Sequence, residues 1–336
     1  MAAFTEIDDP EAYFQTVIYT GDGSANHAIT LGADTDMQPD LVWIKNRDAT
    51  DSHCLFDSVR GATKLLSTDA DAAETTDTDT LDSFASDGFQ VDADVKVNTN
   101  TEGYVAWCWK ESATSGVDIV SYTGNGTDDT DISHNLSAVP KMIIVKNRDT
   151  TDAWQVYHGA NTSAPETDYL VLNDTAATAD AVDRWSDEAP TSSVFTLGDG
   201  AEVNTNTENY IAYCFAEKQG FSKFGSYIGN GNTANNTFVY TGFKVGWVLI
   251  KRSSSSGEGW FIFDSTRSPA NLNVNELRAD TNSAETTGSH YIDFLSNGFK
   301  PKTNGAGIGG SGDTYIYMAF AEAPFVNSNG VPCNAR

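Results

Sequence analysis

The phrase "YTGDG" at Tyr19–Gly23 returns as "YTGNG" at Tyr122–Gly126 and as "YIGNG" at Tyr227–Gly231, at spacings of 103 and 105 residues. Gly beside Asp or Asn supplies the positive φ of a tight turn, so each copy is predicted to end a first strand with a hairpin turn. A phrase of this length can recur by accident, but an internal repeat would carry other phrases with the same period.

Two further phrases keep this period. One runs "LVWIKNR" (Leu41–Arg47), "MIIVKNR" (Met142–Arg148) and "WVLIKR" (Trp247–Arg252). The other runs "YVAWCWK" (Tyr104–Lys110), "YIAYCFA" (Tyr210–Ala216) and "YIYMAFA" (Tyr315–Ala321). Three phrases in one register identify an internal triplication. Its period exceeds the roughly 20–50 residues of a solenoid repeat and suits a small domain.

The phrases divide the chain into three copies. We name them repeat 1 (12–112), repeat 2 (116–218) and repeat 3 (220–326), with a leader over 1–11 and a tail over 327–336. The joints between the repeats, "ESATSG" and "EKQG", are short. Short joints are expected to hold neighbouring repeats close together.

The composition and the apolar runs predict an all-β fold. Apolar residues make up 39% of the chain, which is enough for real cores. Repeat 2 contains the candidate strands "VDIVSYTG", "DISHNL", "KMIIVKN", "WQVYH", "DYLVLN", "SVFTLG" and "NYIAYCFA", with a Thr/Ala/Asp-rich loop through Asp183. Short strands between polar turns are typical of sandwiches. We therefore predict three tandem β-sandwich domains of jelly-roll or lectin-like type, each about 105 residues long.

The last strand of each repeat is expected to be central. Val105, Trp107 and Trp109 share one face, and the opposite face carries Tyr104, Ala106 and Cys108. Both faces are apolar, so both should be covered. Such aromatic residues can also stack on sugars, but this spacing favours a core.

Acidic side chains dominate the charge, since 47 Asp and Glu against 20 Lys and Arg give a formal net charge of −27. This charge repels phosphate backbones and anionic membranes, so nucleic-acid binding and membrane association are not expected. It favours solubility, and affinity for cations or a basic partner is the alternative. An apolar run of about 18 residues is missing, so no membrane-spanning helix is predicted. The N-terminal residues lack a signal-peptide pattern, so no secretion signal is expected.

Residues that could carry chemistry do not form a repeated site. Cys54, Cys108, Cys214 and Cys333 form no C-x-x-C pair and are expected to be reduced. The histidines do not repeat either: His27 and His134 have no counterpart in repeat 3, His53 aligns with Trp154 and Trp260, and His158 aligns with Asp57 and Asp264. A Ser–His–Asp order or a zinc-binding spacing does not emerge.

Three repeated lysines, Lys45, Lys146 and Lys251, end apolar strands. Each is predicted to reach the end of the sandwich or to pair with a carboxylate, because a lysine nucleophile would need a partner base that does not repeat.

Charged pairs and loops offer weaker candidates. Repeats 1 and 3 place Asp57 near Arg60 and Asp264 near Arg267, which predicts a local ion pair or, alternatively, a binding loop. The acidic run at Asp69–Asp82 could hold Ca²⁺ but lacks the calcium-loop pattern. The glycines over 305–310 match G-x-G-x-x-G without a βαβ context, so a glycine-rich hairpin is expected.

Several long phrases, among them "DLVWIKNRD", "LFDSVRGATK", "GFSKFGSYIGNGN" and "YIYMAFAEAPF", resemble repeat modules of bacteriophage virion proteins. These modules are common in tailed phages of marine bacteria and cyanobacteria. The resemblance covers all three repeats. It implies a structural protein of the phage particle with lectin-like sandwich modules, of the tail-fibre or capsid-decoration class, and it supplies no catalytic or ligand-binding residues.

The sequence therefore predicts a non-enzymatic virion protein that is exposed on the particle surface. It would be made in the host cytoplasm and bind the major capsid protein or tail proteins. A host surface glycan is a further expected partner, and the protein is expected to form a homotrimer. No catalytic, cofactor-binding or metal-binding residue is assigned, and no cofactor is expected. The alternatives are a carbohydrate-binding receptor-binding protein and a polysaccharide hydrolase, which would need two carboxylates about 5–10 Å apart.

Overall fold

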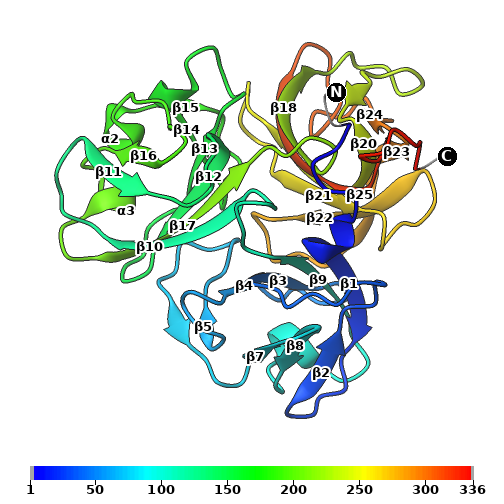
Figure 1. Ribbon diagram of the computed structural model, residues 1–336, viewed down its shortest axis with the longest axis horizontal. Coiled ribbons are helices and arrows are strands. Elements are labelled where there is room, and N and C mark those ends of the chain that lie inside the picture. The colour runs from blue at the N-terminus through cyan, green and yellow to red at the C-terminus, as the bar shows by residue number, and fades with distance from the viewer. Residues whose placement is uncertain (1–3, 334–336) are drawn as a thin grey trace.

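The computed structural model describes residues 4–333, apart from the side chain of Ser289. Strands and a few short helical turns make up this range, so the predicted all-β class is confirmed. Strands that pair with each other in a sheet always belong to the same repeat. Figure 1 shows the chain as three lobes around a common centre.

In each repeat, four neighbouring antiparallel strands, which we call the first sheet, keep the same order, with the first strand at the edge and the last strand beside it. Two further strands extend this sheet in repeat 2, and four extend it in repeat 3. In repeat 1 the order is β1 (Phe14–Thr20), β9 (Gly103–Trp109), β3 (Leu41–Asn46), β4 (Cys54–Asp57). In repeat 2 it is β10 (Val117–Thr123), β17 (Asn209–Ala216), β12 (Pro140–Asn147), β13 (Gln155–His158). In repeat 3 it is β18 (Ser222–Ile228), β25 (Thr314–Pro324), β20 (Phe243–Arg252), β21 (Trp260–Asp264).

A second, smaller group of strands faces the first sheet in each repeat. Repeat 1 has β2 (His27–Thr30), β8 (Gly88–Val91) and β7 (Leu81–Ala85). Repeat 2 has β11 (Thr130–Ser133) and β16 (Val194–Leu197). Repeat 3 has β19 (Val239–Tyr240), β24 (Gly298–Pro301) and β23 (Thr286–Leu295), which β22 (Asn273–Arg278) joins to the first sheet.

The remaining elements are short. They are the strands β5 (Lys64–Leu65), β6 (Thr75–Thr76), β14 (Asp168–Val171) and β15 (Ala179–Asp180), and the helical turns η1 (Pro10–Ala12), α1 (Val95–Asn98), η2 (Pro165–Thr167), α2 (Val182–Trp185) and α3 (Ala201–Asn204). The stretch that was expected to be a loop through Asp183 therefore contains β15 and α2. Its Thr/Ala/Asp composition hid them, because elements this short have no periodicity to detect.

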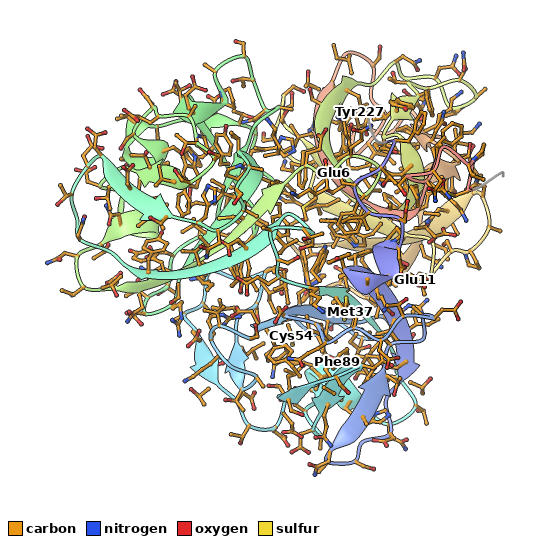
Figure 2. The ribbon with its side chains drawn as sticks, viewed as in Figure 1. Glu6, Glu11, Met37, Cys54, Phe89 and Tyr227 are labelled. Atoms are coloured by element: carbon orange, nitrogen blue, oxygen red, sulfur yellow. The ribbon has the colours of Figure 1, made fainter. Side chains whose placement is uncertain are left out.

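In repeats 1 and 2, the first sheet and the second group of strands enclose a local core. In repeat 1, Met37, Cys54 and Phe89 lie in the lobe between β3, β4 and β8, with at most 1% of each residue exposed (Figure 2). Tyr104 and Cys108 of the last strand belong to the same cluster. Each large apolar side chain buried in this way stabilises the fold by about 1.5–3 kcal/mol.

The other face of the last strand builds a second core that all three repeats share. Trp107 of repeat 1, Tyr213 of repeat 2 and Met318 of repeat 3 occupy the same strand position and belong to one buried cluster. Trp107 and Trp109 also pack against Trp247 of repeat 3, with ring centroids 6.3 and 5.5 Å apart. The predicted covering of both strand faces is confirmed. One face is covered by the strand's own repeat and the other by its neighbours.

The repeated turn phrase is explained by two glycines. Gly23 has a φ of +68°, which a residue with a side chain rarely adopts. A Cβ on Gly21 would lie 2.1 Å from the carbonyl oxygen of Thr99, so only glycine fits there. The hairpin prediction is wrong, however. β1 pairs with β9, whereas β2 pairs with β8, so the turn carries the chain from one sheet to the other.

The segment predicted as a leader is packed onto the fold. Ile7 is 4% exposed and lies in the shared core. The Glu6 amide donates to the Gln219 carbonyl oxygen at 2.9 Å, next to repeat 3. From the other end of the chain, the Ser328 amide donates to Asp8 Oδ1 at 2.7 Å. The last part of the predicted tail, 334–336, lies outside the described residues.

Candidate functional site

Several polar residues singled out in the sequence, among them Asp57, Arg60, His158, Asp264 and Arg267, lie at three seams, which we define as the zones where one repeat borders the next. At each seam a backbone amide of one repeat donates to a carbonyl oxygen at the end of a central strand of the other. The pairs are Glu74 to Arg148 at seam 1–2 (2.9 Å), Thr178 to Ser253 at seam 2–3 (3.0 Å), and Glu285 to Arg47 at seam 3–1 (2.8 Å). Because repeat 3 returns to repeat 1, the seams form a closed ring.

At seam 1–2, Arg60 joins an ion pair to the neighbouring repeat. Its Nε donates to Asp57, and both side chains are fully buried. Its Nη2 donates to the Tyr213 hydroxyl of repeat 2 at 3.2 Å, and that hydroxyl donates to Asp57 Oδ2 at 2.7 Å. The expected local ion pair exists, but it also crosses between repeats.

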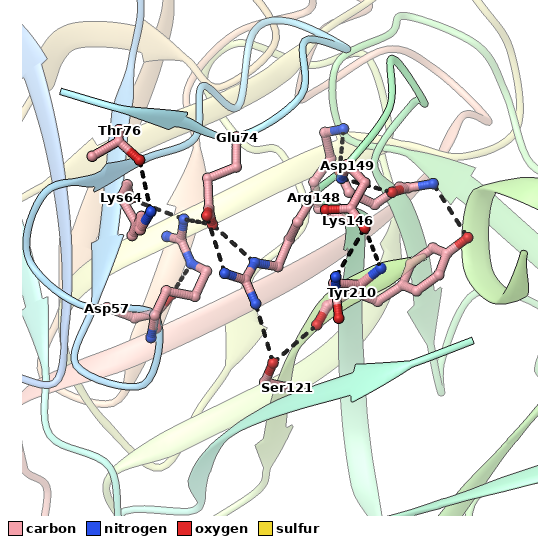
Figure 3. Close-up of polar contacts among 12 residues, drawn as sticks. Asp57, Lys64, Glu74, Thr76, Ser121, Lys146, Arg148, Asp149 and Tyr210 are labelled. Atoms are coloured by element: carbon pink, nitrogen blue, oxygen red, sulfur yellow. Dashed lines mark hydrogen bonds and ion pairs between the residues drawn. The ribbon is translucent and has the colours of Figure 1, made fainter. Parts of the chain in front are cut away.

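Glu74 completes seam 1–2 by accepting from two arginines (Figure 3). Arg60 Nη1 donates to Glu74 Oε2 at 3.1 Å. Arg148 of repeat 2 donates from Nε and Nη2 to the two oxygens of Glu74 at 2.9 and 3.0 Å. The bidentate geometry makes this one of the stronger kinds of charge-assisted contact.

Seam 3–1 repeats the arrangement with one exchange. Arg267 Nε donates to Asp264 at 2.6 Å, and Trp107 Nε1 of repeat 1 donates to the same carboxylate at 3.0 Å, where seam 1–2 has a tyrosine. Glu285 accepts from Arg267 at 2.8 Å and from Arg47 of repeat 1 at 3.0 and 2.7 Å.

Seam 2–3 keeps the amide-to-carbonyl contact of the other two seams but has neutral side chains in place of the charged ones. His158 stands in the place of Asp57, and its Nε2 lies 3.0 Å from the Tyr317 carbonyl oxygen of repeat 3. Asn161 stands in the place of Arg60 and accepts from the Thr178 hydroxyl at 2.7 Å. Thr178 replaces the glutamate, so this seam has no buried ion pair at these positions.

The surroundings shift the pKa values of the seam groups. Burial alone would lower the pKa of Arg60, but Tyr213, Asp57 and Glu74 outweigh it and raise this pKa. Burial opposes ionisation of Glu74 and Glu285, but their arginine partners prevail and lower both pKa values. Burial lowers the pKa of His158 to about 4, so it is neutral near pH 7.

The three repeated lysines are buried and held by main-chain oxygens. Lys45 Nζ donates to the Ala49 carbonyl at 3.1 Å, Lys146 Nζ to that of Asn147 at 2.7 Å, and Lys251 Nζ to that of Glu258 at 2.9 Å. Burial lowers the pKa of each to about 8. The prediction that these lysines reach the end of the sandwich or pair with a carboxylate is therefore wrong, since within residues 4–333 each is buried and donates to carbonyl oxygens. The chain bends after each strand and turns these carbonyl groups toward the ammonium.

A domain family matches nearly the whole chain. Residues 9–324 match the family described as a domain of unknown function, DUF7483. The chain belongs to this family. Its matched segment runs through all three repeats and all three seams. Comparison with curated proteins found no match, and comparison with solved structures found none either.

The histidines serve packing and hydrogen bonding rather than one common site. His53 of repeat 1 accepts from Trp43 Nε1 at 2.8 Å and reaches the Arg278 carbonyl oxygen of repeat 3 at 2.9 Å. His27 contacts Asn98 at 2.9 Å, and His134 contacts the Thr191 carbonyl oxygen at 3.2 Å.

The acidic run and the glycine-rich segment also have structural surroundings. Glu74 lies within the acidic run and belongs to seam 1–2, and Asp69 accepts from the His53 amide at 2.8 Å. Across residues 4–333, no group of three or more His, Cys, Asp or Glu side chains is arranged to hold a metal ion. In the glycine-rich segment, a Cβ on Gly307 would lie 2.5 Å from the Phe261 ring, so the backbone packs directly on that ring.

One groove of ligand size lies beside seam 3–1. It has a volume of about 360 Å³ and runs along the free edge of β1, with Glu11, Gln15, Ser265, Thr266 and Glu322 among its lining residues. Glu322 is paired with Lys244. The groove therefore offers carboxylates and hydroxyl groups to a ligand.

Among residues 4–333, the structure contains no helix of the length and apolar character needed to span a membrane.

Proposed function

We propose that this protein is a non-enzymatic structural component of a phage virion, exposed on the particle surface as a capsid decoration, a head knob or fibre, or a tail fibre. The phage assignment is supported by the resemblance of the repeat phrases to virion modules. The partners in this proposal are the major capsid protein or tail proteins, and the location is the virion.

The observation that carries the structural role is where the charged side chains are placed. Asp57, Arg60, Asp264 and Arg267 could have formed chemical sites, but their side chains are fully buried and contact the adjoining repeat. Groups in this position are shielded from a dissolved substrate. They bind the repeats into one rigid body, which suits a protein that must keep its shape on a particle.

We further infer that the repeats are three tandem β-sandwich domains, of jelly-roll or lectin-like type and about 105 residues each, fused into a ring. The repeated sheet order and the local cores of repeats 1 and 2 support this division. The shared core supports mutual dependence of the domains, so a single repeat expressed alone should expose a large apolar face and aggregate.

The test is to look for the protein in purified particles. Virions banded in a density gradient are analysed by mass spectrometry, and antibody against the protein is located on them by immunogold electron microscopy. The proposal expects a fixed copy number per particle and label on the outside. Absence from washed virions would overturn it. Label on the head or on the tail separates the two attachment modes, and the mass of the purified protein in solution tests the homotrimer.

A polysaccharide hydrolase is the enzymatic alternative. Incubation of the protein with host surface polysaccharide, followed by size-exclusion chromatography, tests it. Depolymerisation would replace the non-enzymatic proposal.

A further inference from the structure

The outer face of the second strand group is built alike in repeats 1 and 3. In repeat 1, Ile29 of β2 pairs with Phe89 of β8, and both point into the core. In repeat 3, Val239 of β19 pairs with Phe299 of β24, and both are buried in the same way. Repeat 2 pairs Ile132 with Phe195. Residues on either side of the inward one must point outward, because side chains alternate along a strand.

These outward positions differ sharply between the repeats. Repeat 1 has Ala28 and Thr30, and repeat 2 has Asp131 and Ser133, all exposed. Repeat 3 has Phe238 and Tyr240, which are 44% and 60% exposed. Since small or polar residues support the same strand twice, the fold does not require aromatic side chains here. Two large rings exposed side by side need another explanation, because such patches mark interaction sites.

The two rings lie in a setting suited to a flat ligand. They are two residues apart, with Phe238 directly before β19 and Tyr240 at its end, so their side chains are roughly 7 Å apart on the same face. A Cβ on Gly298, opposite Tyr240, would lie 2.0 Å from the Val239 carbonyl oxygen and 3.1 Å from Phe238 Cε2, so the backbone requires the glycine and the Phe238 ring lies close to it. The Tyr240 hydroxyl has no hydrogen-bond partner within residues 4–333 and is free to bind one.

Polar groups border the rings on the same face. Lys300 follows Phe299 on β24, so it points outward beside Phe238, and Asp293 is its cross-strand partner on β23. Lys300 Nζ donates to Asn235 Oδ1 at 2.7 Å, which uses one of its three donors. Figure 1 places β23 and β24 on the outer side of the repeat 3 lobe, away from the common centre.

We propose that Phe238 and Tyr240 form a binding platform for a neutral glycan, with pyranose rings stacked on the two aromatic faces. The C–H groups of a sugar face the electron-rich ring surfaces, and the Lys300 ammonium and the Asp293 carboxylate meet its hydroxyl groups. The net charge of −27 repels polyanions, which selects an uncharged glycan over an acidic one. The platform goes beyond a structural role in the virion and would give the particle a means of adhering to a host surface.

The test uses the intact protein and three neutral oligosaccharides, cellohexaose, maltohexaose and mannohexaose, titrated at about 0.15 M salt and followed by NMR and calorimetry. At least one is expected to bind with a Kd on the order of 1 mM. F238A/Y240T gives repeat 3 the residues of repeat 1 and should weaken binding more than about 10-fold, or roughly 1.4 kcal/mol. V182T, which alters an exposed apolar residue of repeat 2, is the matched control and should bind like the wild type.

Two further variants keep the proposal falsifiable. K300Q introduces the Gln90 of repeat 1 and should weaken binding several-fold. A28F/T30Y/Q90K places the two rings and the lysine on repeat 1 and should raise the number of sites from one to two. The melting temperatures of F238A/Y240T and V182T should match the wild type, because these side chains are exposed.

The outcomes that overturn the proposal are equally definite. Absence of saturable binding to all three oligosaccharides up to about 10 mM would refute it. So would wild-type affinity in F238A/Y240T, or tighter binding of an oligoguluronate than of the neutral sugars. Presence in virions is measured separately, so failure of glycan binding leaves the structural proposal standing.

Discussion

Seams 1–2 and 2–3 join neighbouring repeats with the same backbone contact and opposite side-chain chemistry. Seam 1–2 buries Asp57 and Arg60 as an ion pair, whereas seam 2–3 has His158 and Asn161 at these positions. The amide-to-carbonyl distances at the two seams are nevertheless 2.9 and 3.0 Å. The ring geometry is therefore set by the main chain and the shared core, and the side chains of the seam can be exchanged as a set.

The charged and the neutral seam also differ in the free-energy cost of burying their side chains. Burying two charges carries a desolvation penalty of several kcal/mol per ion, which the pair and its hydrogen bonds must offset. The neutral seam avoids that penalty and has fewer contacts. Loss of one charged partner should therefore destabilise seam 1–2 strongly, whereas protonation of His158 should destabilise seam 2–3.

Asp57→Asn should have the largest effect, because it leaves the Arg60 charge buried without its closest partner. The free energy of unfolding is expected to fall by about 3–5 kcal/mol, measured by urea denaturation. Asn161→Ala in the neutral seam is the matched control and should cost about 1 kcal/mol, the value of one lost hydrogen bond. Equal losses in the two variants would remove the distinction between the seams.

Of seams 1–2 and 2–3, the neutral seam should respond to acid first. His158 has a pKa of about 4 in the fold and about 6.5 when unfolded, so its contribution is complete above pH 6.5 and is lost as pH falls toward 4. The loss amounts to about 3 kcal/mol. Glu74 and Glu285 have lowered pKa values, so their contribution is lost only below about pH 4.5.

The measurement is a series of unfolding curves between about pH 7 and pH 4 for the wild type and His158→Gln. Buried His53 has a pKa well below its ordinary value and loses stability in the same window, so the difference between the two proteins isolates His158. Parallel curves would show that the neutral seam is not acid-sensitive through this residue.

Arg148→Gln tests the outer part of the charged seam. It removes the bidentate contact with Glu74 and should lower the free energy of unfolding by about 1 kcal/mol, since the arginine side chain is 20% exposed and screened. The loss should shrink at about 1 M salt. Ser253→Ala, at the equivalent place in seam 2–3, should be silent, and a comparable loss there would contradict the assignment.

A small net change is expected when a whole seam is exchanged. The triple variant D57H/R60N/E74T gives seam 1–2 the side chains of seam 2–3. Replacing a buried ion pair as a unit is often close to neutral, so stability should change by less than about 2 kcal/mol, well below the loss in Asp57→Asn. A triple variant less stable than the single one would show that the seams are not interchangeable.

Much of the fold could be predicted from the sequence, because its signals were repeated three times. The phrase at Leu41–Arg47 predicted an apolar strand, and β3 occupies it. The apolar faces of Tyr104–Lys110 predicted coverage on both sides. What could not be predicted was the source of that coverage, since a pattern of burial does not say whether the cover comes from the same repeat or another one.

The seams were harder to predict for a related reason. Asp57 and Arg60 are three residues apart, which suggested a local pair, but their contact with Tyr213 bridges 153 to 156 residues of sequence. Glu74 and Glu285 keep the repeat period and could have been noticed for that. Their loops share no other pattern, and Glu74 lies within the acidic run at Asp69–Asp82, which was considered only as a Ca²⁺ site.

The contact between Asp8 and Ser328 brings the two ends of the described chain together beside repeat 3. With the ring already closed through seam 3–1, the covalent joint between repeats 1 and 2 is only one of three equivalent places where the chain could be open. A circular permutant that starts at the joint over 111–116, with a linker between residues 4 and 333 so that Ile7 stays in the shared core, should therefore reach the same native structure.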